Sequence, residues 1–95
     1  MVVIEFEGIT LDVEKQTASV GKKVIRLDRV ETVVLMRLLA ARGRPVSSEE
    51  LAISAFPARV DSLTPATYIS RLRRKLGPSR IATTTLVGYY IQEAP

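Results

Sequence analysis

The first 27 residues carry short apolar segments separated by polar residues. Segment 9–13 alternates apolar and polar residues with a period of two, which is typical of a strand with one buried face. Further apolar segments of similar length lie at 2–6, 18–20 and 24–27. Gly8 and Gly21 stand in the short connections. At Gly21 a tight hairpin needs the positive φ that glycine adopts easily. The pattern predicts four short antiparallel strands with one covered face.

From residue 29 the apolar residues recur at helical spacing up to residue 42. Asp28 precedes this segment and Glu31 follows three residues later, which is the arrangement of a capping box. Gly43 supplies a C-terminal stop. Because little of the segment is polar, we expect a buried helix over 29–42. We interpret Glu31 as a capping residue only.

Two more helices and a hairpin follow. Ser47 is a good N-cap for a helix over 47–56, and there too we interpret Glu49 as part of the capping. Thr64 and Pro65 are a cap and a first-turn proline for a helix over 65–76, which Gly77-Pro78 ends. β-Prone segments at 81–84 and 89–91 predict a closing hairpin.

The helix over 65–76 has two unlike faces when residues are placed 100° apart. Its core stripe is expected to consist of Pro65, Ile69, Leu72 and Leu76. The opposite face carries Thr67, Ser70, Arg71 and Arg74. Tyr68 and Lys75 lie along one edge and Arg73 along the other. A helix with arginines and hydroxyls on its outer face suits the major groove of DNA, where arginine pairs with guanine and hydroxyls bond bases or phosphates.

Charge and composition narrow the function classes. The 95 residues have a net charge of +4, but residues 59–80 hold six Lys/Arg against one Asp, while residues 1–58 are neutral. Such a concentrated basic segment is typical of nucleic-acid binders. The chain has neither Cys nor His, which disfavours an enzyme, a metal site and a disulfide scaffold. We therefore expect a non-enzymatic protein without cofactors, located in the cytoplasm on the nucleoid, with no membrane partner.

Three blocks of sequence resemble the OmpR/PhoB-type effector domain of bacterial response regulators. They are 27–31, which reads LDRVE, with Leu35, then 44–51, RPVSSEEL, and finally 69–76, ISRLRRKL. Ile81 with Thr83 and Gly88-Tyr89 also match, near the end. The resemblance covers about residues 4–91. It implies an α+β fold: a winged helix-turn-helix with an N-terminal four-stranded antiparallel sheet, three helices and a C-terminal β-hairpin wing. We expect residues 1–95 to be one such domain, without a receiver domain.

The resemblance also implies functions for individual residues. Arg71 would read a base, Thr64, Ser70 and Arg73 would contact bases or backbone, and the loop 57–63 would touch RNA polymerase. The full set expected to contact double-stranded DNA is Thr64, Thr67, Tyr68, Ser70, Arg71, Arg73, Arg74, Lys75, Arg80, Thr83 and Thr85. The core set is Leu27, Leu35, Leu51, Ile69, Leu72, Leu76 and Tyr89. Two copies are expected to bind tandem half-sites about one helical turn apart.

The sequence leaves a second function open. Thr85-Leu86 stands at the wing tip where the family usually has Arg-Gly, so we expect little reading of the minor groove and specificity that comes mainly from the major groove. The segment 63–68 also departs from the usual family motif. The alternative is therefore a winged-helix protein-interaction module that engages RNA polymerase or another regulator, with weakened DNA binding.

Overall fold

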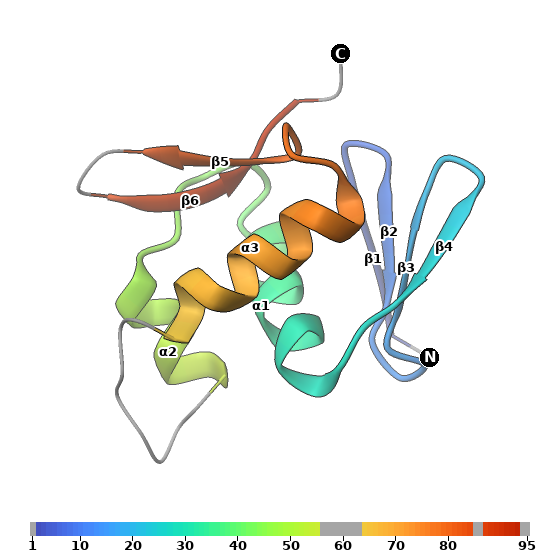
Figure 1. The fold of residues 1–95 in the computed structure, drawn as a ribbon, viewed down its shortest axis with the longest axis horizontal. Coiled ribbons are helices and arrows are strands. Elements are labelled where there is room, and N and C mark those ends of the chain that lie inside the picture. The colour runs from blue at the N-terminus through green and yellow to red at the C-terminus, as the bar shows by residue number, and fades with distance from the viewer. Residues whose placement is uncertain (1, 56–63, 85–86, 94–95) are drawn as a thin grey trace.

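A computed structural model describes residues 2–55, 64–84 and 87–93. In these residues the chain forms a four-stranded sheet, three helices and a two-stranded hairpin, in that order (Figure 1). The strands of the sheet are β1 (Val3–Phe6), β2 (Ile9–Asp12), β3 (Thr17–Val20) and β4 (Lys23–Arg26). This architecture confirms the winged-helix fold that the sequence predicted.

The N-terminal sheet is an antiparallel meander in the order β1-β2-β3-β4. The turn from β1 to β2 places both Glu7 and Gly8 at positive φ, 50° and 79°, as the favoured two-residue hairpin turn requires. Alternate residues of the strands face the core, where Ile9, Leu11 and Ala18 are fully buried. The period-two pattern of the sequence therefore identified the covered face correctly.

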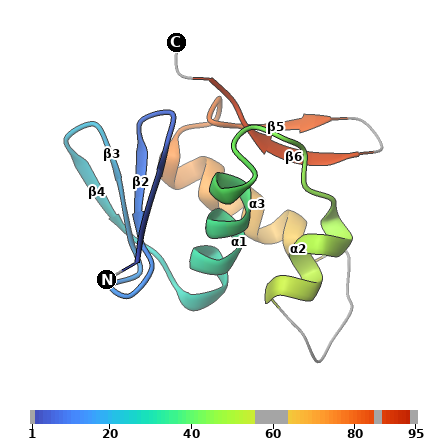
Figure 2. The same cartoon turned by 180° about the vertical axis from the view of Figure 1, so that it is seen from behind.

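Helix α1 (Arg29–Ala40) is the central element. It packs against the sheet, both other helices and the last strand, and Figure 2 shows the sheet on one side of it and the hairpin on the other. The predicted capping box is present: Asp28 Oδ1 accepts from the Glu31 amide at 2.7 Å, and Glu31 Oε1 accepts from the Asp28 amide at 2.9 Å. The helix is two residues shorter than the predicted 29–42, because Arg42 and Gly43 have positive φ and cannot continue a right-handed helix.

The helix-turn-helix consists of α2 (Ser48–Ala55) and α3 (Thr64–Leu76), which pack against each other and against α1. Ser47 caps α2 as predicted, its hydroxyl accepting from the Glu50 amide at 3.1 Å. The predicted last residue of this helix, Phe56, lies outside the described residues. Among residues 2–55, 64–84 and 87–93, none of the helices has both the length and the apolar character of a membrane span.

The hairpin of β5 (Ile81–Thr84) and β6 (Gly88–Ile91), called the wing below, is attached to the chain ahead of α2. Val46 and Tyr89 exchange two backbone hydrogen bonds of 2.8 and 2.9 Å. The approach is so close at Gly88 that a Cβ there would lie 2.0 Å from the Val46 carbonyl oxygen. Only glycine fits this position, which fixes the wing beside the helix-turn-helix.

Candidate nucleic-acid interface

The inner side of α3 is the apolar stripe that the sequence predicted. Ile69, Leu72 and Leu76 are at most 6% exposed, and Pro65 is buried with them. They join the core cluster that also contains residues of the sheet and of α1. The helical phase deduced from the sequence is therefore confirmed, and it determines which side chains face outward.

The opposite side of α3 is open to solvent. Thr67, Ser70, Arg71 and Arg74 are all exposed, as expected. Arg74 lies in the last helical turn together with two other cations, a position where the helix dipole favours positive charge. These four residues, called the outer face below, combine two cations with two hydroxyls that donate or accept hydrogen bonds.

One edge of α3 is bonded to the wing. Arg73 Nε donates to the Ile81 carbonyl at 3.0 Å, and its terminal nitrogen donates to Thr83 Oγ1 at 2.6 Å. The same guanidinium lies 5.8 Å from the centre of the Tyr89 ring. Arg73 was expected to contact DNA; in the structure its donors are directed to the hairpin, so it connects the wing to α3.

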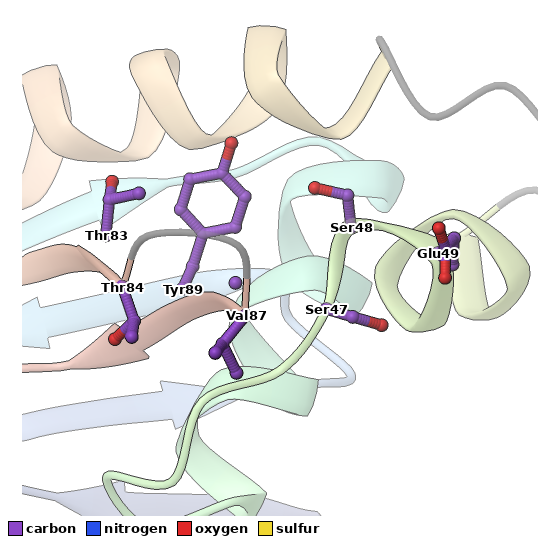
Figure 3. Close-up of a pocket in the computed structure, with 8 residues that line it drawn as sticks. Ser47, Ser48, Glu49, Thr83, Thr84, Val87 and Tyr89 are labelled. Carbon is purple, nitrogen blue, oxygen red and sulfur yellow. The ribbon is translucent and has the colours of Figure 1, made fainter.

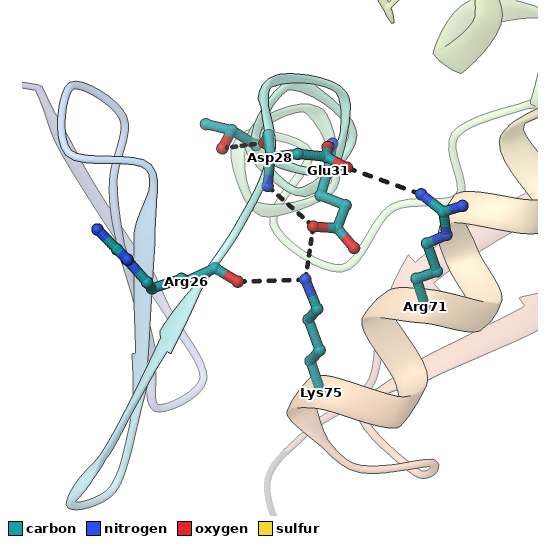
Figure 4. Close-up of polar contacts among 6 residues, drawn as sticks. Arg26, Asp28, Glu31, Arg71 and Lys75 are labelled. Atoms are coloured by element: carbon teal, nitrogen blue, oxygen red, sulfur yellow. Dashed lines mark hydrogen bonds and ion pairs between the residues drawn. The ribbon is translucent and has the colours of Figure 1, made fainter.

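The other edge of α3 meets the start of α1 (Figure 4). Lys75 Nζ donates to Glu31 Oε1 at 2.7 Å and to the Arg26 carbonyl at 3.2 Å. Arg71, one turn earlier, lies 3.7 Å from Asp28 Oδ2. Two acids spaced three apart on one helix thus face two cations spaced four apart on the other. Lys75 was expected to contact DNA, and its ammonium is instead directed into the protein.

The ion pair of Glu31 was missed by sequence reasoning, which gave this residue only a capping function. Its side chain is 1% exposed. A signal was present, because Glu31 lies at helical spacing with the buried Leu35 and Leu38 and so belongs to the core stripe of α1. A carboxylate on a core stripe needs a charged partner. The sequence could predict that need, but not which cation meets it.

Arg80 is a third basic residue, after Arg73 and Lys75, that donates to a group within the protein. It is 9% exposed, and its guanidinium donates to the Glu7 carbonyl in the turn between β1 and β2. Its Nε is buried without a hydrogen-bond partner among the described residues. This placement joins the base of the wing to the sheet and directs the Arg80 guanidinium into the protein.

The remaining expected residues fall in different places. Tyr68 is half-buried, and its ring lies 4.9 Å from the Arg71 guanidinium carbon. Thr83 is exposed on β5, where it accepts from Arg73. Thr64 is the first residue of α3, but its side chain is outside the described part. Thr85 and the loop 57–63 are also outside it, so their expected contacts stay predictions.

A shallow depression of about 310 Å³ separates the start of α2 from the wing (Figure 3). It is lined by Ser47, Ser48, Glu49, Thr83, Thr84, Val87, Gly88 and Tyr89. Hydroxyls outnumber the carboxylate of Glu49 among its polar side chains, which equips the depression for hydrogen bonding. Among the described residues no cluster of acids could hold a metal ion.

Comparison with known proteins gives one family and many similar structures. The model of the family described as "Transcriptional regulatory protein, C terminal" matches residues 21–91. A search of curated protein sequences gives no significant match. The DNA-binding domain of CpxR from E. coli superposes with a TM-score of 0.82 at 26% identity, over 100% of both chains. The C-terminal domain of the nisin resistance regulator NsrR gives 0.81 at 30% identity, over 97% of this chain and 98% of that one.

A third similar structure is the Klebsiella pneumoniae RstA DNA-binding domain, solved in complex with the RstA box. Its TM-score is 0.79, over 96% of this chain and 97% of that one. At 23% identity this similarity concerns the fold alone. Two further matched chains are longer, and this chain spans 44% and 43% of their length.

Proposed function

Because this chain belongs to the family of transcriptional regulatory protein C-terminal domains, the OmpR/PhoB-type DNA-binding winged helices, we propose that it binds double-stranded DNA sequence-specifically. The outer face of α3 enters the major groove, and the complex regulates transcription. The observation that carries the proposal is the exposure of Thr67, Ser70, Arg71 and Arg74 on one face, directly opposite the buried stripe. The family is one of DNA-binding and not enzymatic domains, which also favours DNA over the protein-interaction alternative.

Within the outer face, we assign base reading to Arg71 and phosphate binding to Arg74. Arg71 lies near the middle of α3, and its guanidinium plane lies beside the Tyr68 ring, so its orientation is restricted in a way that suits bidentate pairing with guanine. Arg74 has an exposed side chain in the last turn, where a cation can reach and neutralise a phosphate. Arg73, Lys75 and Arg80 are left out of the contact set, because all three donate to groups within the protein.

The proposal extends to assembly. A single small module buries little DNA surface, and two copies on tandem half-sites about one helical turn apart would bind more tightly. The loop 57–63 remains the candidate contact for RNA polymerase, and the site of action would be the nucleoid in the cytoplasm.

The first test is a selection of bound duplexes from a random-sequence library, followed by titration at about 50 and 200 mM salt. We expect an enriched motif and an affinity that falls steeply with salt, because bound phosphates exchange counterions for protein cations. Absence of both an enriched motif and salt-sensitive binding would overturn the proposed function and favour the interaction module.

The second test separates the two arginines. Arg71→Ala should weaken binding to the selected duplex by about 1–3 kcal/mol and relax the preference at one base position. Arg74→Ala is the matched control: it should weaken binding to all sequences alike and lower the salt slope by about one. A uniform loss in both variants would show that Arg71 does not read a base.

A further inference from the structure

The N-cap of α1 lies against the arginine that we assign to base reading. Asp28 uses Oδ1 to cap the helix, accepting from the Glu31 amide, and Oδ2 lies 3.7 Å from Arg71 Nη1. Both side chains are half exposed, at 50% each. The pair therefore lies at the surface, next to the outer face of α3, and not in the core (Figure 4).

Arg71 is held from two sides. Asp28 attracts one terminal nitrogen, and the Tyr68 ring lies 4.9 Å from the guanidinium carbon. An arginine has five N–H donors, and an ion pair at one nitrogen leaves enough donors on the other edge for a bidentate bond to guanine N7 and O6. Fixing the side chain before binding reduces the conformational entropy lost on binding.

The Asp28 carboxylate also disfavours non-specific contacts between Arg71 and DNA phosphates. A phosphate that approached Arg71 in a non-specific complex would also approach the negative charge of Asp28, and like charges at a contact disfavour the wrong partner. A guanine edge presents only the partial negative charges of N7 and O6, so this repulsion is weaker there than at a phosphate. One acid thus supports the base contact and opposes the phosphate contact.

We propose that Asp28 is a positioning residue for specificity: it orients Arg71 toward a base and keeps the same guanidinium from binding phosphates. This inference rests on the proposed function. It adds a second function to a residue that sequence reasoning treated only as a helix cap.

Asp28→Asn tests the inference, because asparagine is about as good an N-cap as aspartate and removes only the charge. The affinity is measured for the duplex selected with the wild-type protein and for a random-sequence duplex at the same salt. We expect the ratio of specific to non-specific affinity to fall by about two- to five-fold, the range expected of a half-exposed ion pair. Asp28→Ser, which also caps without a charge, should give the same fall, and circular dichroism melting checks that both variants are folded.

Two controls separate this effect from net charge. Asp12→Asn makes the same charge change on β2 and should leave the ratio unchanged. In an Arg71→Ala background, Asp28→Asn should also leave it unchanged, because the effect acts through that arginine. An unchanged ratio in the single variant, or an equal fall in either control, overturns the inference while DNA binding itself stands. A wild-type protein that selects no duplex overturns the proposed function and this inference together.

Discussion

The outer face of α3 and the two edges beside it have nearly the same sequence chemistry and opposite environments. Four cations fall within five residues, at positions 71, 73, 74 and 75. Arg74 is exposed on the outer face, whereas Arg73 is bonded to the wing and Lys75 to a buried acid of α1. The difference teaches that a count of cations overstates the number that are exposed and without a partner element, because Arg73 and Lys75 donate to groups within the protein. Neighbouring elements on either side of the helix take up those at its edges.

Arg71 lies between these two cases. It belongs to the outer face, yet it is paired with Asp28 at the edge toward α1. Such a residue is restricted without being buried, which is the condition expected of a side chain that must meet one base in one orientation. If the proposed function holds, the edges of α3 would anchor the helix, the exposed Arg74 would bind phosphate and Arg71, between them, would read a base.

The largest expected effect is a difference in stability between a variant of the inner stripe of α3 and a variant of its outer face. Leu72→Ala should lower the free energy of unfolding by about 2–5 kcal/mol, because Leu72 is fully buried and its truncation leaves a cavity. Ser70→Ala on the outer face should change it by no more than about 0.5 kcal/mol. Urea denaturation of both variants measures the difference, and equal stabilities would contradict the helical phase.

The next effect is a difference in stability between variants of two adjacent cations, Lys75 and Arg74. Lys75→Ala should destabilise the fold by about 1–3 kcal/mol, because the buried Glu31 carboxylate loses its cation; partial exposure of Lys75 keeps the loss below that of a fully buried pair. Arg74→Ala should be nearly neutral for stability and should show its effect in DNA binding. If Lys75→Ala leaves the melting temperature unchanged and lowers the salt slope of DNA binding instead, the division between edge and outer face fails.

The smallest effect concerns the edge that faces the wing. Arg73→Ala should cost about 0.5–1.5 kcal/mol of stability, through the loss of bonds to a carbonyl and a hydroxyl of β5. Arg73→Lys keeps the charge but not the planar set of donors, so it should fail to restore stability fully. Denaturation midpoints of the two variants, measured side by side, test this; complete restoration by lysine would mean that the charge alone matters.

Much of the site was predictable because short-range rules control it. The capping box at Asp28 depends on residues three apart, and the inner stripe with Leu72 depends on helical periodicity, so both could be read from the sequence. The same periodicity placed Ser70 and Arg74 on the exposed side. Periodicity could not predict which residue pairs with a side chain at an edge of the helix, for example that of Lys75.

The sequence by itself determined the order of the elements, the turns at Gly8 and Gly21 and the inner and outer sides of α3, since each depends on residues a few positions apart. Only the tertiary structure decided that Arg80 closes onto the turn at Glu7, 73 residues away, and that Lys75 meets Glu31, 44 residues away. Those pairings arise where separate elements pack together. No periodicity along the chain encodes the distance between elements, so the set of cations that stays exposed is decided only when the fold is complete.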